Sequence, residues 1–396
     1  MKALDQSPLD PEFVQNPYPF YDTAREQGDL FHWNNYGFPC AAGFSTVNDL
    51  LRDRRFGREM PDDLRPEIPD HLAAFYAVEK HSLLELEPPK HTRIRSLLVR
   101  TFTSRRINDL GPEIDRITRQ LCDKFPDQPF DIITEFAEHI PVIIICKMLG
   151  VPKEMGPQLL RWSHDMVAMY QARRDRGVED RAVAATLAFS DYIKQLLAER
   201  QQNPGDDLIT HLIDARSKGE KLSEEELITT CILLLNAGHE ATVHSIANGI
   251  KTILESGQPA ISYFNDDKST LRCIDETIRF DPPLHMFTRI ALQDISIFDH
   301  DFKRGDSVGL MLAAANRDPA HYKNPDRFDV LRGGVGQLGF GAGLHFCIGA
   351  PLARLEMGIA LPILFERFPA LKIVEKPVYA NRYHFHGLEK LMVTSG

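Results

Sequence analysis

The fold is decided by one ten-residue stretch, Phe340-Gly341-Ala342-Gly343-Leu344-His345-Phe346-Cys347-Ile348-Gly349. Its glycines permit backbone turns that other residues cannot make, and they allow close approach to a planar ligand. Cys347 comes just ahead of an apolar helical pattern, with Pro351 near the first turn, where proline is tolerated. Amide N–H groups at a helix start favour a thiolate. The stretch therefore predicts a cysteine that acts as a thiolate ligand and not as an inert thiol.

The other five cysteines are scattered, and no C-x-x-C pair occurs, which excludes a zinc ribbon, a thioredoxin-type motif and a small disulfide scaffold. We expect them to be buried thiols in a reducing compartment. The 396 residues carry 46 basic and 56 acidic side chains, a formal charge of −10. This acidic excess counts against nucleic-acid or anionic-membrane partners. The chain lacks a signal-peptide pattern and any run of 18 apolar residues, so we expect a cytoplasmic protein without a membrane anchor.

Apolar spacing predicts a mainly α fold with a smaller β portion. Helical periodicity dominates residues 90–254, whereas strand-like segments occur near residues 38–44, 290–298 and 307–312. Ser223 and Glu226 match a capping box, which predicts a helix through residue 254, roughly 45 Å long. A long irregular stretch, residues 316–343, leads into the Cys347 segment, and loops of this length are usually functional.

The middle of that long helix breaks its own apolar pattern. Gly238 and the carboxylate of Glu240 interrupt a run of apolar residues. A buried acid needs a physical reason to exist, so Glu240 is a candidate functional residue. His239 and His244 resemble a metalloprotease signature, but five residues place them on different faces of a helix, where they cannot bind one zinc together.

The Cys347 segment resembles the haem-binding loop of the cytochrome P450 family, F-G-x-G-x-H-x-C-x-G, at every specified position. Further matches to this family follow in order along nearly the whole chain. They are the helix entry at residues 88–95, the oxygen-binding stretch at 237–240, the E-x-x-R helix at 276–279 and the P-D-R-F segment at 325–328. The resemblance is to the bacterial type, and it implies one P450-fold domain, residues 1–396, that encloses one haem b between the long central helix and the Cys347 loop.

The resemblance also implies which residues hold this cofactor. Cys347 is then the axial iron ligand, and a thiolate in this position favours O–O cleavage. The implied cofactor-binding residues, including the anchors of the haem propionates, are His91, Arg95, Arg289, Phe340, His345 and Gly349. His91 and Arg95 are four residues apart and therefore share one helix face.

A polar cluster is implied to support the cysteine loop. Glu276 and Arg279 are three apart on a helix, which suits an internal ion pair. In the family an arginine that matches Arg327 joins this pair, so we expect a structural cluster of these three residues.

One position departs from the family pattern. The acid that matches Glu240 is usually followed by a threonine that helps to deliver protons, but here Ala241 follows and Thr242 comes one residue later. Thr242 lies about 100° further around the helix, so it is poorly placed to compensate. We favour the hypothesis that a hydroxyl of the substrate or an ordered water takes the place of this threonine in the proton relay. The other reading is a different reaction, such as oxidative coupling or desaturation.

The resemblance predicts an enzyme, an iron-dependent monooxygenase that oxidises a small, largely apolar molecule with O₂ and two electrons. The rival from another class is a non-catalytic haem-thiolate sensor or carrier. Candidate substrate contacts are Asn236, Met286, Phe287 and Phe385. Residues 90–106 contain six lysines and arginines and no acid, which suits an acidic ferredoxin or flavodoxin supplied by its reductase. The alternative is an ordinary solvated basic face.

Overall fold

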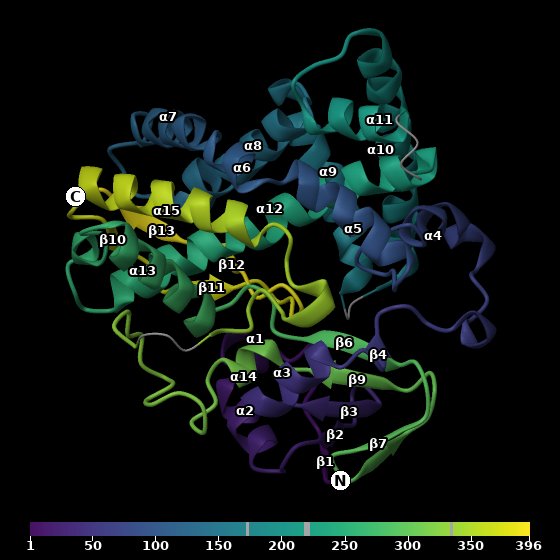
Figure 1. The fold of residues 1–396 in the computed structure, drawn as a ribbon. Coiled ribbons are helices and arrows are strands. Elements are labelled where there is room, and N and C mark those ends of the chain that lie inside the picture. Colours follow the sequence, from purple (N-terminus) through teal and green to yellow (C-terminus); the bar gives the residue numbers. More distant parts are fainter. Residues whose placement is uncertain (172–173, 218–221, 333–335) are drawn as a thin grey trace. The chain divides into compact units, whose positions relative to one another are not determined.

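The computed structural model describes residues 1–171, 174–217, 222–332 and 336–396 (Figure 1). The chain forms two compact units. One comprises Met1–Leu64, Ile114–Ala137 and Ala241–Gly396, and the other comprises Arg65–Glu113 and Glu138–Glu240. Every described strand lies in the first, which we call the mixed unit, and we call the second the helical unit.

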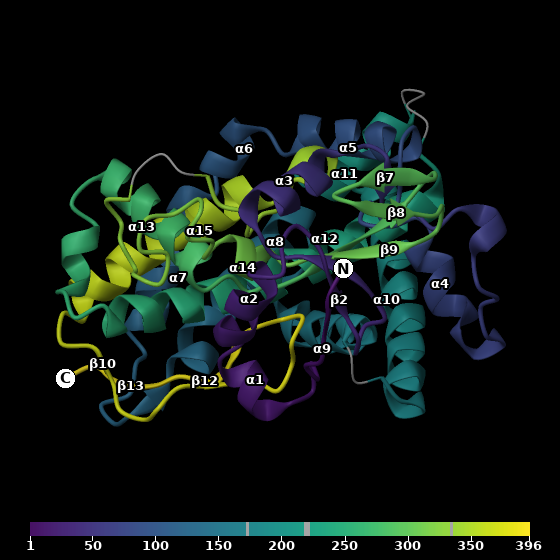
Figure 2. The same ribbon diagram turned by 90° about the horizontal axis from the view of Figure 1, so that it is seen from below.

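The helical unit packs its helices through interlocking apolar and aromatic side chains. Trp162 of one helix stacks near Phe189 and Tyr192 of the next, with ring centroids 5.3 and 6.0 Å apart. These two helices, α9 and α10, run beside each other in Figure 2. The helices of the unit are α4 (Ala73–Glu79), α5 (Lys90–Thr101), α6 (Ser104–Asn108), α8 (His139–Leu149), α9 (Gly156–Val167), α10 (Arg176–Gln202), α11 (Leu208–Ser217) and the first half of α12 (Glu224–Glu255).

Helix α12 is the longest, with 32 residues and a length of about 48 Å. The predicted capping box is present: the amide of Ser223 donates to Glu226 Oε2 at 2.9 Å, and the amide of Glu226 donates to Ser223 Oγ at 3.1 Å. Glu226 also pairs with Arg93 of α5, whose Nη1 lies 3.0 Å from Glu226 Oε2. One carboxylate therefore starts the helix and ties it to α5.

The mixed unit is built around a six-stranded sheet with the order β1-β2-β3-β9-β6-β4. Apolar side chains such as Val308, Leu310 and Phe56 fill one core beside it, and Trp33, Tyr21 and Phe31 fill another. Figure 1 shows α2, α3 and α14 next to this sheet. Its strands are β1 (Ala3–Leu4), β2 (Phe31–Trp33), β3 (Phe38–Ala41), β4 (Phe56–Gly57), β6 (Phe287–Ala291) and β9 (Ser307–Leu310).

Smaller sheets and a set of helices complete the mixed unit. Helices α13 and α15 run side by side, and Gly358 of α15 faces Ile274 of α13. The smaller sheets use β5 (Phe130–Asp131), β7 (Ile295–Ile297), β8 (His300–Phe302), β10 (Lys372–Ile373), β11 (Val378–Tyr379), β12 (Leu388–Lys390) and β13 (Met392–Thr394). The helices are α1 (Pro11–Gln15), α2 (Tyr18–Arg25), α3 (Phe44–Arg52), α7 (Gly111–Cys122, mostly in this unit), α13 (Asp267–Phe280), α14 (Leu312–Ala315) and α15 (Ala350–Arg367).

The predicted fold class is confirmed, since helices dominate and the strands form a smaller portion. Strands occur at or beside each predicted segment, and the helical pattern predicted just after Cys347 is α15. Across the described ranges, no helix combines the length and the apolar character needed to cross a bilayer.

Candidate haem-thiolate site

Cys347 lies directly before α15 and is the one cysteine of the six that is exposed. Its amide donates to the Phe340 carbonyl oxygen at 3.0 Å, which closes the loop on itself. Gly349 is the N-cap of α15, so the thiol lies two residues before the cap. The positive end of the helix dipole therefore faces the segment that holds the sulfur, a setting that favours the thiolate.

Two glycines give this loop a shape that side chains would prevent. Gly341 and Gly343 both have φ of +69°. A Cβ on Gly343 would lie 2.4 Å from the Leu51 carbonyl oxygen, a distance that real contacts do not reach, and one on Gly341 would lie 3.3 Å from Phe287 Cε2. The loop is thus held closely against α3 and β6 of the same unit.

The other cysteines are buried thiols, as the sequence predicts. Burial raises the pKa of Cys122 and Cys146 to about 11 and that of Cys231 and Cys273 to about 12, and it raises the pKa of Cys40 further. These thiols remain protonated at neutral pH, which leaves Cys347 as the cysteine suited to bind a metal.

Two predicted propionate anchors belong to the mixed unit. Arg289 lies within β6, opposite Val308 of β9, and is only 3% exposed. Its Nη1 donates to the Thr288 carbonyl oxygen at 2.9 Å, which orients the guanidinium. His345 ends the 3₁₀ turn Gly343–His345, two residues before Cys347.

The other two predicted anchors belong to the helical unit. His91 and Arg95 both lie on α5, four residues apart and therefore on one face of that helix. His91 is fully buried, whereas Arg95 is half-buried. A buried imidazole beside a cationic side chain is the kind of surface that receives a carboxylate.

Glu276 and Arg279 form a buried, two-pronged ion pair on α13. Arg279 Nε lies 2.7 Å from Glu276 Oε2, and Arg279 Nη2 lies 2.8 Å from Oε1. The remaining hydrogens of the guanidinium go to backbone carbonyls of Asn316, Pro325 and Arg327 at 2.8, 2.9 and 3.1 Å. This arginine therefore ties the irregular chain after α14 to α13, a structural role.

The third side chain of this cluster is Arg332, and the prediction of Arg327 needs correction. Arg327 joins the cluster only through its backbone carbonyl oxygen, and Arg327 is an exposed residue. Arg332 Nε lies 3.4 Å from Glu276 Oε1, and its Nη2 donates to the carbonyl oxygens of Asn324 and Arg327. The amide of Asp329 also donates to Glu276, at 2.8 Å. The chain turns back after Arg327, so that the side chain of Arg332, five residues later, reaches the Arg327 carbonyl. Sequence analysis missed Arg332 because no local periodicity indicates this turn.

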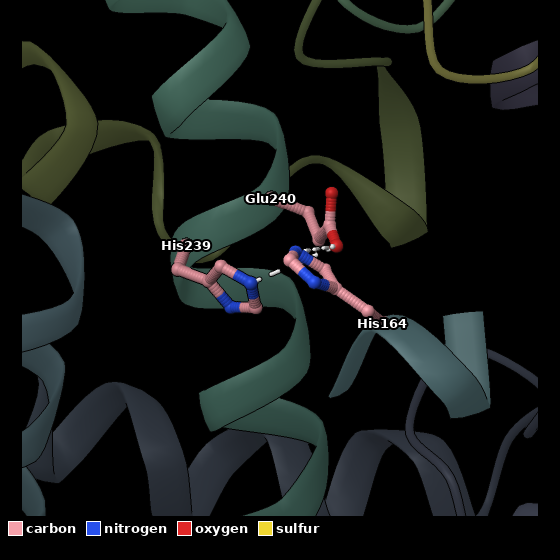
Figure 3. A group of neighbouring side chains, drawn as sticks. All are labelled: His164, His239 and Glu240. Atoms are coloured by element: carbon pink, nitrogen blue, oxygen red, sulfur yellow. Dashed lines mark ion pairs between the residues drawn. The ribbon is translucent and has the colours of Figure 1, made fainter. Parts of the chain in front are cut away.

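Glu240 is buried on α12 and lies in a cluster with two histidines, shown in Figure 3. Glu240 Oε1 is 3.1 Å from His164 Nε2, which comes from α9, and 3.7 Å from Nε2 of the neighbouring His239. The sequence pointed to the carboxylate, but nothing in the sequence indicated His164, because the contact joins two separate helices.

The next residues of α12 carry no hydroxyl at the position where the family usually has one. Ala241 offers its carbonyl oxygen to Ser245 Oγ at 2.7 Å, the ordinary back-bond of a serine within a helix. Thr242 is buried one residue further along the same continuous helix. The geometry therefore keeps Thr242 about 100° away from position 241.

The predicted substrate contacts occupy different settings. Asn236 of α12 donates from Nδ2 to Met166 Sδ at 3.7 Å, and its buried Oδ1 has no hydrogen-bond partner among the described residues. Met286 is packed within an apolar cluster of the mixed unit. Phe287 and Phe385 are half-buried, on β6 and on the bridge to Leu284. Asn236 is thus the polar group here that is best placed to take a ligand.

The basic stretch at residues 90–106 presents fewer exposed charges than its sequence suggests. Arg93 is paired with Glu226, and Arg95 is half-buried. The residues that are exposed are Lys90, Arg100, Arg105 and Arg106. Lys90 and Arg100 lie on α5, and Arg105 and Arg106 lie on α6, both in the helical unit.

The donor types of these residues fit a haem-thiolate group. Cys347 offers a soft thiolate for iron at a helix start. Arg289 and His345, and in the helical unit His91 and Arg95, offer the cations and hydrogen-bond donors that two carboxylates need. The backbone around Gly343 leaves no space for a side chain at this position. Without that side chain, the loop backbone can lie close to a flat ligand.

Comparison with known proteins identifies the family of the chain. The sequence model of the family described as "Cytochrome P450" matches residues 65–256 and 247–378. The chain is 32% identical to a biotin biosynthesis cytochrome P450 of Bacillus subtilis (strain 168) over 99% of both chains. It is 33% identical to a vitamin D(3) 25-hydroxylase of Pseudonocardia autotrophica, over 97% of this chain and 95% of the relative.

Solved structures show the same similarity. The crystal structure of P450BioI in complex with hexadec-9Z-enoic acid ligated acyl carrier protein has a TM-score of 0.91 and 32% identity, covering 97% of this chain and 99% of that one. The structure of CYP109E1 from Bacillus megaterium in complex with testosterone has a TM-score of 0.86 at 27% identity, covering 99% and 100%. The chain therefore belongs to the cytochrome P450 family and is an enzyme, an oxidoreductase of the oxygen-incorporating type.

Proposed function

We propose that this enzyme inserts one oxygen atom from O₂ into a small, largely apolar organic molecule, with haem b as its cofactor. The observation that carries the proposal is the exposed Cys347 at the start of α15, within a loop whose backbone only glycine allows at Gly343. When bound, a haem-thiolate group supplies the activation of oxygen. We further propose that residues 1–396 act as one haem-binding domain.

The test uses ¹⁸O₂ and haem-loaded protein with a surrogate ferredoxin and its reductase. Candidate substrates are first selected by the shift in spin state that they cause in the ferric protein. A product that carries one ¹⁸O atom supports the proposal. A product without the label indicates desaturation or coupling, and the absence of any product with all spin-shifting compounds indicates a sensor or carrier.

In this proposal the chain's own residues hold and orient the cofactor. Cys347 would bind the iron through its sulfur, and Phe340 and Gly349 belong to the loop that holds it. Arg289, His345, His91 and Arg95 would hold the propionates through charge-assisted hydrogen bonds, which are about twice as strong as neutral ones. Arg289 is pre-oriented by its bond to the Thr288 carbonyl.

The substrate proposal rests on apolar surroundings with few polar groups. Asn236 presents a buried amide oxygen without a hydrogen-bond partner among the described residues, and this oxygen can accept from a substrate donor. Phe287 and Phe385 supply half-buried aromatic surface. The molecules bound in two of the similar solved structures, a hexadec-9Z-enoic acid on an acyl carrier protein and testosterone, are themselves largely apolar. We propose a substrate of this chemical class.

Glu240 is the proposed proton donor of the reaction, with a substrate hydroxyl or an ordered water in place of the missing threonine. Ala241 cannot supply this group itself, because its side chain is a single methyl. A water that bridges two groups is nearly as good as a direct hydrogen bond.

Ala241→Thr is expected to lower the peroxide released per reducing equivalent consumed with a poorly fitting substrate. The introduced hydroxyl is a proton donor at the position where the wild type depends on substrate or water. A positioned donor speeds a proton-transfer step by about 10²-fold or more. We expect a decrease of roughly twofold or more in peroxide, measured by a peroxidase-coupled assay. Unchanged peroxide yields with every substrate would rule out the relay.

Electrons are proposed to come from an acidic ferredoxin or flavodoxin that docks on the exposed cations of residues 90–106. Lys90, Arg100, Arg105 and Arg106 form this docking surface. Opposite charges speed the encounter of two proteins and do so less at high salt.

Arg100→Glu is expected to slow reduction of the ferric protein severalfold at low salt and to flatten its dependence on ionic strength, because it reverses a charge within the docking surface. Stopped-flow reduction by a surrogate ferredoxin measures this. Lys124→Glu is the control, since it reverses an equal exposed charge outside residues 90–106. Equal effects of both variants would contradict a docking role for this surface.

A further inference from the structure

His164, His239 and Glu240 bring three metal-binding side chains together within the helical unit (Figure 3). One ligand atom from each lies within 4.8 Å of the others. His164 Nε2 and His239 Nε2 are 3.1 and 3.7 Å from Glu240 Oε1. Zinc bonds of about 2.0–2.1 Å in a tetrahedron place two ligand atoms about 3.4 Å apart, so these separations bracket the value that zinc requires.

The hydrogen bonding of His239 leaves the correct nitrogen for a metal. Its Nδ1 lies 3.0 Å from the Leu235 carbonyl oxygen, which can only accept, so Nδ1 carries the hydrogen. Nε2 then holds a lone pair, and within the described chain this buried atom has no hydrogen-bond partner. A histidine oriented by a backbone carbonyl through its second nitrogen is the usual form of a zinc ligand.

The cluster has apolar residues on one side and a partly exposed histidine, through which an ion can enter. His239 also lines a small apolar pocket with Ile145, Leu159 and Leu235, a low-dielectric wall on one side. The His164 side chain is 54% exposed, whereas those of His239 and Glu240 are 4% and 6% exposed. An ion can therefore reach His164 from solvent and bind the two buried ligands next.

We propose that His164, His239 and Glu240 bind a zinc ion, with water as the fourth ligand. Imidazole nitrogens and a carboxylate are a ligand set typical of zinc. Binding requires His164 Nε2 to release its hydrogen, so the ring takes the Nδ1–H tautomer. Zinc then occupies the Glu240 carboxylate and inhibits turnover. This last step rests on the proposed role of Glu240 as proton donor, whereas the metal site itself rests on the geometry.

A second cluster, Asp281, His285 and His386, meets the same distance criterion but suits a metal less well. All three residues are buried, so no exposed ligand offers an entry. Asp281 already accepts from the Tyr379 hydroxyl and lies 3.7 Å from the Lys251 ammonium, which repels a cation. Among the described residues we therefore assign the zinc site to the His164 cluster.

The experiment is equilibrium dialysis of the chelator-washed, haem-loaded protein against zinc chloride, with zinc and iron counted in the same sample by mass spectrometry. We expect one zinc per chain in the wild type, and a dissociation constant at least about tenfold higher in His164→Gln, because even indirect ligand contacts change metal affinity about 10–100-fold. The iron content shows that each variant is folded and loaded.

His71→Gln is the matched control. His71 forms a similar partly exposed pair with Glu179, at 2.7 Å, but no second histidine completes a cluster there among the described residues. This variant should keep the zinc affinity of the wild type. X-ray absorption at the zinc edge should show imidazole ligands. No zinc uptake by the wild type, or equal affinity in His164→Gln, overturns the site.

Turnover separates the two proposals. If zinc inhibits the wild type and not His164→Gln, both the site and the role of Glu240 are supported. If zinc binds as expected but leaves turnover unchanged, the metal site stands and the proposed role of Glu240 fails.

Discussion

Cys347→Ser is expected to abolish turnover and to remove the haem-thiolate position of the Soret band in the reduced, CO-bound protein. Serine keeps the size of the side chain but is not a thiolate, so iron loses the ligand that favours O–O cleavage. The loop itself should survive, because its shape depends on Gly341, Gly343 and the bond from the Cys347 amide to Phe340. Absorption spectra and the ¹⁸O₂ assay together measure the effect.

Cys122→Ala is the control for the loss of a thiol. Cys122 is buried on α7, and burial raises its pKa to about 11, so it remains a protonated thiol at neutral pH. This variant should keep the thiolate spectrum and most of the turnover. A thiolate spectrum that persists in Cys347→Ser would show that Cys347 is not the ligand.

Arg279→Ala is expected to give protein that is insoluble or lacks haem. The change leaves the buried Glu276 carboxylate without its bidentate partner. Breaking a buried ion pair in this way typically lowers the free energy of unfolding by roughly 3–5 kcal/mol. The backbone carbonyls of Asn316 and Pro325 also lose this donor, whereas the Arg327 carbonyl keeps its hydrogen bond from Arg332. Soluble yield and the ratio of haem to protein measure the outcome.

The corrected cluster supplies graded controls for this prediction. Arg332→Ala should cause an intermediate loss of haem-loaded protein, because the Arg332 side chain contacts Glu276 at 3.4 Å. Arg327→Ala should leave the yield close to that of the wild type, since only the Arg327 carbonyl joins the cluster. The idea fails if Arg327→Ala is as damaging as Arg279→Ala, or if Arg279→Ala loads haem normally.

Local signals in the sequence predicted much of the fold. The capping box at Ser223 and Glu226 located the start of α12 within one residue, because both hydrogen bonds join residues three apart. The loop around Cys347 was predicted for the same reason, since its glycines and its helix start are neighbours in the chain. The order of the strands in the six-stranded sheet was not predictable in this way, because β3 pairs with β9, whose residues come more than 260 positions later in the chain.

The parts of the site that sequence analysis missed depend on tertiary contacts. His164 meets Glu240 only because α9 and α12 pack together, and no spacing in the sequence indicates this. Arg332 takes the place predicted for Arg327 because the chain between them turns back on itself. In both cases the residue type was visible in the sequence, but its partner was not.

The pairing of Arg93 with Glu226 has a consequence for the ion atmosphere around the protein. A partner that approaches residues 90–106 displaces counterions only from cations that are open to water, and Arg93 is already neutralised from within. Four of the six cations that the sequence counts are exposed, and Arg106, one of these four, lies 3.9 Å from Asp206. The affinity of an acidic partner should therefore decrease with salt less steeply than the six formal charges of the stretch would dictate.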